Sequence, residues 1–149
     1  MSANSVSAQV ESLYGTWRLL SNVRELVATG ERVDIFGKAP QGFITYGRDG
    51  RMFAIVVGDN RLRPPDLAKL TDQERAELFK TMVAYAGTFK VEGTRVLHSV
   101  DISWNENWTG SVQVRSFRFE GRRLIITGGP QIGPDGREVI AVLTWEKAD

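Results

Sequence analysis

Three polar side chains stand out in the C-terminal half of the chain because each occupies a position where an apolar one is expected. The strand-like alternation around His98, Gln113 and Arg115 predicts that all three point inward among hydrophobic residues. An imidazole can exchange hydrogen bonds with a ligand, and a guanidinium binds acidic groups. These residue types therefore suit a small ligand that has one polar or acidic group.

Arg115 and His98 could each have a structural role in place of a role in ligand binding. A buried arginine needs a partner, so Arg115 either meets a ligand carboxylate or phenolate or caps Trp17 together with backbone carbonyls. His98 could contact a ligand, act as a general base or be a satisfied core histidine. A general base needs an orienting carboxylate, but Asp101 and Glu120 are predicted to point outward. We therefore predict no catalytic residue.

Composition excludes several classes of function. Nineteen basic and eighteen acidic residues give a net charge of +1, too balanced for binding nucleic acid or an anionic membrane surface. The sequence has no cysteine and one histidine, which rules out disulfides, cysteine nucleophiles and cysteine or two-histidine zinc sites. We expect no metal and no cofactor.

Short β-branched and aromatic runs, separated by Gly, Asp, Asn and Pro, predict eight or nine strands. The expected strands cover Thr16 to Val27, Arg32 to Phe36, Gly42 to Tyr46, Arg51 to Val57, Gly87 to Val91, Thr94 to Trp104, Ser111 to Phe119, Arg122 to Thr127 and Glu138 to Glu146.

Turn positions predict how the strands after residue 94 pair. A loop from Asn105 to Gly110 would place His98 opposite Phe117, and a turn at Glu120-Gly121 would place Phe117 opposite Leu124. Side chains alternate between the two faces. The predicted inward set is Val96, His98, Val100, Ile102, Gln113, Arg115, Phe117, Phe119, Leu124, Ile126, Val139, Ala141, Leu143 and Trp145, and in the first strand Trp17, Leu19, Ser21 and Val23, with Arg18 and Asn22 outward.

One segment departs from the strand pattern. Thr71 and Glu74 form a capping box, which predicts a helix from about 72 to 85 whose apolar stripe lies on the sheet or plugs one end. The preceding segment with Pro64-Pro65 is expected to be an ordered loop. A long series of hairpin-linked strands leaves two exposed edges unless it closes. We therefore predict an all-β fold, a closed antiparallel up-and-down barrel with one helix.

Aromatic side chains are numerous enough to line a pocket for a flat apolar ligand, although the same residues could simply form a core. With the polar set, the candidate ligand-binding residues are His98, Arg115, Gln113, Phe117, Trp17, Tyr46, Phe53 and Trp145.

Several blocks of sequence resemble a known family. Gly15-Thr16-Trp17 is similar to the Gly-x-Trp start of lipocalins, and the blocks YGRDGRM, AYAGTF, NWTGSVQVRSF and LTWEK resemble the bacterial and fungal lipocalin-like domain family of calycin-type barrels. The resemblance spans Leu13 to Lys147. It implies a barrel with a ligand-sized interior and no agreed reaction, and it implies a basic side chain over Trp17, either Lys147 or Arg115.

The leading hypothesis is a binding protein that holds a small hydrophobic or aromatic, and in one version acidic, molecule inside the barrel. The alternative is an isomerase or cyclase acting on a secondary metabolite, with His98 or Tyr46 as general acid or base. We expect residues 1–12 to be a disordered tail, residues 13–149 to be one domain, and the location to be cytoplasmic because no secretory signal or membrane span is visible. A homodimer is left open.

Overall fold

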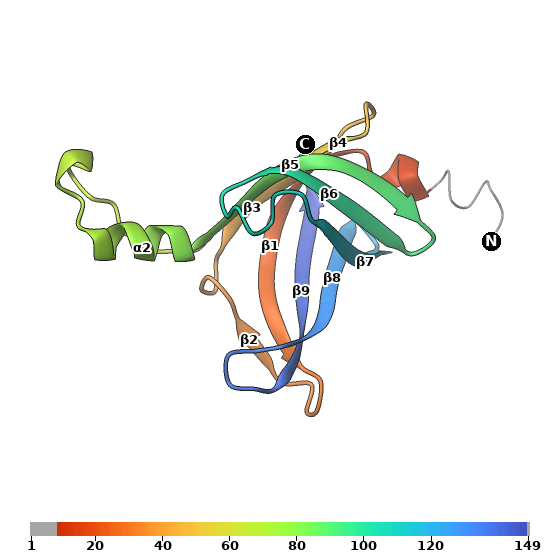
Figure 1. Ribbon diagram of the computed structural model, residues 1–149. Coiled ribbons are helices and arrows are strands. Elements are labelled where there is room, and N and C mark those ends of the chain that lie inside the picture. The colour runs from red at the N-terminus through yellow and green to blue at the C-terminus, as the bar shows by residue number, and fades with distance from the viewer. Residues whose placement is uncertain (1–8, 149) are drawn as a thin grey trace.

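The computed structural model describes residues 9–148, and strands dominate it (Figure 1). The elements are β1 (Gly15–Leu26), β2 (Arg32–Asp34), β3 (Gln41–Tyr46), β4 (Arg51–Val57), a 3-10 turn (Leu67–Lys69), α2 (Asp72–Lys80), β5 (Met82–Glu92), β6 (Arg95–Ser103), β7 (Val112–Glu120), β8 (Arg123–Ile132) and β9 (Glu138–Lys147). Residues 9–13 form a further helical turn. The predicted tail lies mostly outside the described residues.

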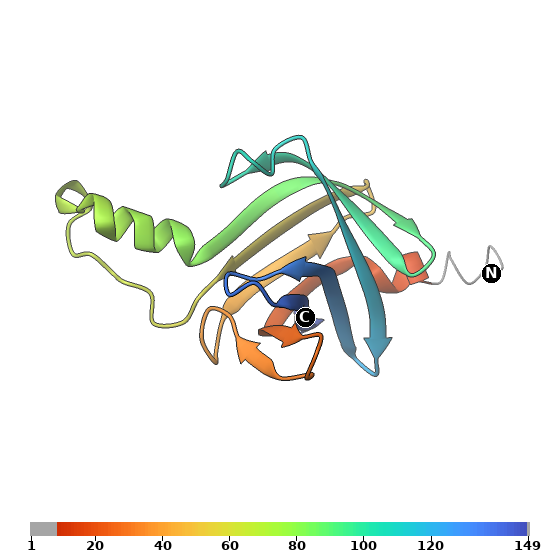
Figure 2. The same ribbon diagram turned by 60° about the horizontal axis from the view of Figure 1, so that its bottom comes forward.

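The strands form a closed antiparallel barrel, as predicted. Each strand from β3 to β9 pairs with the next, and β1 closes the sheet by pairing with both β3 and β9. The short strand β2 pairs with the far end of β1 and stands outside the eight-stranded ring. Closure leaves the ring without a free edge, and Figure 2 shows the strands wrapping around a common interior.

The pairing of the later strands differs from the prediction, although most of their side chains lie on the predicted face. His98 lies opposite Gln113 and not Phe117, and Phe117 lies opposite Ile126 and not Leu124. The first shift arises because residues 104–111 form a longer connection, in which the Gly110 N–H donates to the Val100 carbonyl. The observed partners differ from the predicted ones by four and by two residues, and because both numbers are even these shifts alone move no side chain to the other face.

A bulge in β1 overturns the prediction for its second half. Leu19 pairs with Trp145 and Ser21 with Thr144, so Leu20 is an extra residue without a partner. The extra residue reverses the alternation. Asn22, predicted to point outward, is therefore only 5% exposed and faces the interior, while Val23 packs with Ile125 and Val142 in a separate cluster.

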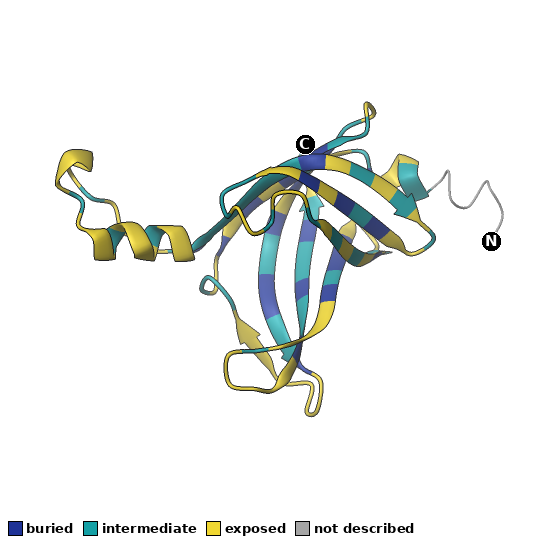
Figure 3. Cartoon of the chain, viewed as in Figure 1, coloured by how far each residue is buried: buried dark blue, intermediate teal, exposed yellow. Residues whose placement is uncertain are grey.

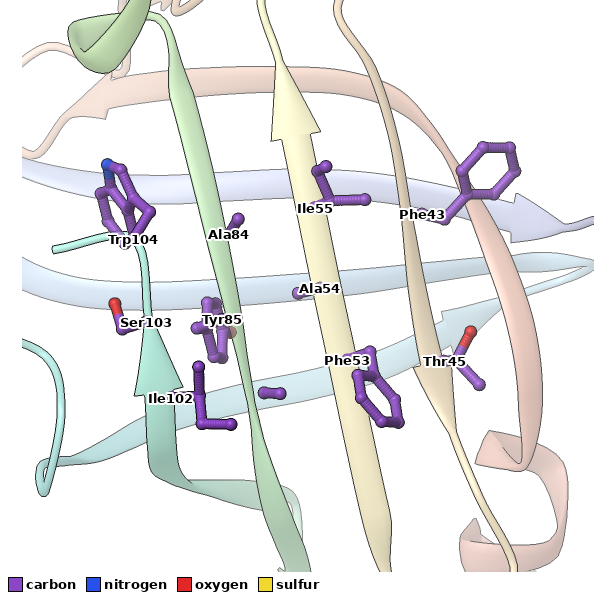
Figure 4. A pocket seen from close by; sticks show the side chains of 11 residues that line it. Phe43, Thr45, Phe53, Ala54, Ile55, Ala84, Tyr85, Ile102, Ser103 and Trp104 are labelled. Atoms are coloured by element: carbon purple, nitrogen blue, oxygen red, sulfur yellow. The ribbon is translucent and has the colours of Figure 1, made fainter.

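A second bulge, at Asp101 in β6, corrects the prediction for Ile102. Gly87 pairs with Val100 but Ala86 pairs with Ile102, so Asp101 is the extra residue. Ile102 consequently turns outward and is 69% exposed. It joins Phe53, another predicted pocket residue that lies on the outer face, in an apolar groove across β3 to β6 (Figure 4).

The helix α2 is shorter than predicted and does not cover the barrel. It begins at the expected capping box but ends at Lys80, and Met82 already belongs to β5. None of its residues is buried, and together with the preceding loop it projects away from the barrel (Figures 1 and 3). The predicted apolar stripe consisted of Ala76, Phe79, Met82, Val83 and Ala86. The last three of these lie in β5, so the helix has little apolar surface to bury.

One end of the barrel is filled. Leu13 is completely buried, its carbonyl accepts a hydrogen bond of 2.9 Å from the Trp17 indole, and Phe119 packs against the Trp17 ring. The Lys147 ammonium lies 4.5 Å from the centre of the Trp17 ring and donates to the Tyr14 carbonyl. Lys147, and not Arg115, is therefore the basic residue over Trp17.

Candidate functional site

A cavity of about 130 Å³ lies inside the barrel, toward the end opposite Trp17 and Leu13. Its wall combines apolar residues with a few polar ones from all eight strands of the ring and the loop after β6. The lining residues are Asn22, Arg24, Ile44, Ala54, Val56, Val83, Tyr85, His98, Trp108, Arg115, Ile126, Gly128, Gln131, Ala141, Leu143 and Trp145. A cavity of ~150 Å³ is known to admit benzene, so this space is suited to a single ring.

His98 is held between two tyrosines. It is 1% exposed, its Nε2 lies 2.7 Å from the Tyr46 hydroxyl, and its Nδ1 lies 2.8 Å from the Tyr85 hydroxyl. The three residues come from β3, β5 and β6, and the inward alternation of each strand brings them together. Both ring nitrogens are therefore occupied without any carboxylate.

Burial keeps this histidine neutral. Loss of solvent, with the nearby Arg115 charge as a second cause, lowers the pKa of His98 to about 3. Burial likewise raises the pKa of Tyr85 to about 12 and raises that of Tyr46. All three groups are consequently uncharged near neutral pH.

The surroundings of the two tyrosines indicate which ring nitrogen carries the proton. A neutral imidazole has one donor and one acceptor nitrogen. Tyr46 is 1% exposed and does not line the cavity, so its hydroxyl proton has no partner other than His98 Nε2 among the described residues. Leaving that proton unpaired would be costly. We therefore infer that Nδ1 carries the proton and donates to Tyr85, whose own O–H is free to point into the cavity.

Two arginines approach the cavity from different strands. Arg24 in β1 donates to the Asn22 side chain at 3.0 Å, and Arg115 in β7 donates to the Gln113 side chain at 3.2 Å. Burial, with Arg115 as a second cause, lowers the pKa of Arg24. The Arg115 side chain lies over Gly128, where an added Cβ would come within 3.3 Å of its guanidinium carbon.

The predicted site residues separate into four groups: residues that line the cavity, residues behind its lining, residues of the packed core and one residue on the outer face. His98, Arg115 and Trp145 line the cavity, while Tyr46 and Gln113 stand behind it and hold His98 and Arg115. Phe117 and Trp17 belong to the packed core near the filled end. Phe53 is 55% exposed on the outer face, which contradicts its predicted place in the pocket.

Several cavity residues are absent from the predicted ligand-binding set, and of these Arg24 and Tyr85 matter most. Arg24 was hidden by the bulge at Leu20, although the adjacent pair Leu19-Leu20 interrupts the alternation and could have signalled it. Tyr85 was placed at the end of the helix, but it lies in β5. Trp108, in the loop after β6, also lines the cavity.

The groove on the outer face is larger, about 510 Å³, and almost wholly apolar. Figure 4 shows Phe43, Phe53, Ile55 and Ile102 extending over its strands. Its lining residues include no charged side chain and no imidazole. The interior cavity, where donors converge, is therefore the better candidate site despite its smaller volume.

A closed antiparallel barrel that encloses a cavity is the architecture of barrel proteins that hold one small ligand. The chain belongs to the lipocalin-like domain family, whose model matches residues 14–148. It is also similar to the 4'-hydroxy-3'-methoxypropiophenone carrier protein ppsC of Aspergillus oryzae, with 32% identity over 85 residues that cover 52% of this chain and 77% of the relative.

Within residues 9–148, no helix has the length and apolar character to cross a bilayer. The same residues contain no group of three or more histidine, aspartate or glutamate side chains placed to hold a metal ion.

Proposed function

We propose that this protein is a carrier that holds a small aromatic molecule in the barrel cavity. The observation that carries the proposal is the enclosed space bounded by Tyr85, His98 and Trp145, in which apolar walls surround a few hydrogen-bond donors. The fold fits small-molecule binding, and the relative from Aspergillus oryzae is named as the carrier of an aryl ketone. An acidic substituent on the ligand would be met by Arg115.

The size of the cavity limits the ligand to about one ring with short substituents. The enclosed part is close to the volume that admits benzene. Substituents can extend toward Gln131, which is exposed, and Trp108, which is half-buried. Aryl ketones and phenols of this size are therefore the first candidates to test.

Titration with 4'-hydroxy-3'-methoxypropiophenone, followed by tryptophan emission, tests the proposal. Ala141→Leu would fill the cavity from β9, whereas Ala86→Leu adds the same carbons to the outer groove. We expect the first variant to weaken binding at least tenfold and the second to leave it unchanged, with thermal melts confirming that both fold. Absence of binding, or equal effects of the two substitutions, would refute an interior site.

The enzyme alternative, in which His98 or Tyr46 is the general acid or base, has weaker support. A second titratable group, Tyr85, does converge on His98. Efficient general acid–base catalysis favours a pKa near the working pH, whereas burial moves the pKa values of His98 and Tyr85 to about 3 and about 12. The same donors are well suited to binding, which needs no proton transfer.

The cellular location and the oligomeric state of the protein are still predictions. A cysteine-free chain is compatible with the cytoplasm, which cell fractionation would test. A homodimer is also an expectation, which sedimentation analysis would test. The exposed apolar groove on the outer face is the kind of surface that protein–protein contacts cover.

A further inference from the structure

Two positive charges face the cavity without a negative partner. Neither Arg24 nor Arg115 forms a salt bridge with any residue between 9 and 148. Their acceptors are neutral: the Asn22 side chain at 3.0 Å and the Val23 carbonyl at 3.4 Å for Arg24, and the Gln113 side chain at 3.2 Å and the Val114 carbonyl at 3.1 Å for Arg115. A guanidinium has five N–H donors, so each retains donors for another partner.

The rest of the cavity wall supplies no balancing charge. The ionisable residues that line it are Arg24 from β1, Tyr85 from β5, His98 from β6 and Arg115 from β7. The lining residues from β3, β4, β8, β9 and the loop after β6 have no ionisable side chain. With the histidine and tyrosine neutral, the wall carries two positive charges that repel each other. Burial is the main cause that lowers the pKa of Arg24, and the Arg115 charge is the second cause.

The uncharged polar groups of the wall add donors. The Trp145 indole N–H is buried and has no acceptor in the described part of the chain. The tautomer inferred for His98 leaves the Tyr85 O–H free as well. An unpaired buried donor is unfavourable, so a ligand rich in acceptor atoms would satisfy groups that no other described residue pairs.

We infer that the cavity binds its ligand as an aryl oxyanion, a phenolate or carboxylate placed between Arg24 and Arg115, and so selects the ionised form of a weakly acidic arene. This inference rests on the proposed carrier function and names the chemical class of the cargo. The O–H bond of the acid breaks and its proton passes to solvent, because both His98 nitrogens are already engaged and the lining offers no carboxylate to accept it. The anion then remains paired with the guanidiniums.

A chromophoric pair of probes tests the inference. 4-Nitrophenol changes colour on ionisation, whereas 4-nitroanisole has a methyl group in place of the acidic proton and remains neutral. Spectrophotometric titration of 4-nitrophenol with and without excess protein gives its pKa in the bound and free states. We expect the bound pKa to be at least ~1 unit lower, which corresponds to tenfold preference for the phenolate.

Matched arginine variants connect that shift to the two charges. Arg24→Gln and Arg115→Gln each keep an amide donor but remove a charge, and Arg118→Gln removes a charge from the outer face of the same strand as Arg115. We expect the two inner variants to remove most of the shift while 4-nitroanisole affinity changes less than about threefold. Arg118→Gln is expected to behave as the unaltered protein.

The outcomes separate the two proposals. If 4-nitroanisole binds in the cavity but bound 4-nitrophenol keeps its free pKa, the oxyanion inference is overturned and the carrier proposal stands. If neither probe, nor any of the aryl ketones, binds, the carrier proposal fails and the inference fails with it. An equal shift in all three arginine variants would also overturn it, because the selectivity would then have another source.

Discussion

At the level of single residues, the Tyr46–His98–Tyr85 arrangement resolves the open question about His98. Protein groups satisfy both hydrogen bonds of His98, yet His98 also lines the cavity. Because its Nδ1 donates to Tyr85, the Tyr85 O–H is free to donate to a group in the cavity. Under the proposed carrier function, the role of His98 is to orient Tyr85, and Tyr46 in turn sets the tautomer of His98.

Removing the two tyrosine hydroxyls should have unequal effects. Tyr46→Phe leaves a buried imidazole nitrogen without its donor, which should lower the free energy of unfolding by about 1 to 3 kcal/mol. Tyr85→Phe should cost less because Tyr85 borders the cavity, where water can replace its hydroxyl. Denaturant unfolding of both variants measures the difference. A larger loss for Tyr85→Phe would contradict the proposed direction of the hydrogen bonds.

The depressed pKa of His98 predicts a loss of stability in mild acid. The ordinary value is 6.5 and the folded value about 3, so the unfolded chain binds a proton that the folded chain does not. Stability should be complete above pH 6.5 and fall by up to about 1.4 kcal/mol per pH unit as the pH decreases toward 3.

Comparison with His98→Gln isolates this effect. Between pH 7 and 5 most carboxylates stay ionised, so the unfolding midpoint of the unaltered protein should fall in that range while that of the variant stays nearly level. Parallel profiles for the two proteins would show that His98 is not the group responsible.

At the level of elements, the strands and closure followed from the sequence but the bulges did not. Alternation identified the inner face of β7, where burial alternates with period two, and it identified the buried residues Leu124, Ile126 and Trp145 of β8 and β9. A bulge adds one residue without changing composition. The bulge residue Leu20 therefore concealed the inward direction of Arg24, and the bulge residue Asp101 caused Ile102 to be predicted on the wrong face.

The candidate site was predictable only where no bulge or connection intervened. His98, Arg115 and Trp145 were found because they lie on regular stretches of strand. Tyr85 was missed because the capping box correctly marked where the helix starts, whereas nothing local marked its end before β5. Phe53 was misassigned because the outer face of β4 is itself apolar, so composition could not separate its two faces.

The close approach at Gly87 gives a prediction about β5. A Cβ there would lie 1.8 Å from the Ser99 carbonyl oxygen of β6, a backbone atom that cannot move aside. Gly128→Ala is the matched control, because its added Cβ would meet only the Arg115 side chain, which can shift. We expect Gly87→Ala to lower stability by about 3 kcal/mol or to prevent folding, and Gly128→Ala to cost under ~1 kcal/mol. Similar thermal melts for both would contradict the tight β5–β6 contact.

Across the whole molecule, the two ends of the barrel have different roles. The filled end is packed around Trp17, whereas the cavity lies nearer the end where the chain leaves β4 for the projecting segment with α2. Rigid packing at one end supports an open space at the other. Ile44, Ala54, Val56, Ile126 and Trp145 belong both to the core cluster and to the cavity wall, whereas Leu13, Trp17 and Leu19 belong to the core alone.

Leu13 tests that division because it is completely buried at the filled end although it lies outside every strand. Leu13→Ala should lower the free energy of unfolding by about 2 to 5 kcal/mol. Leu67→Ala, at a position 80% exposed in the projecting segment, should change it by less than ~0.5 kcal/mol. Chemical denaturation measures both, and titration with 4'-hydroxy-3'-methoxypropiophenone below the melting temperature should give the same affinity for each folded variant. A small loss for Leu13→Ala would mean that the helical turn at residues 9–13 does not close the barrel.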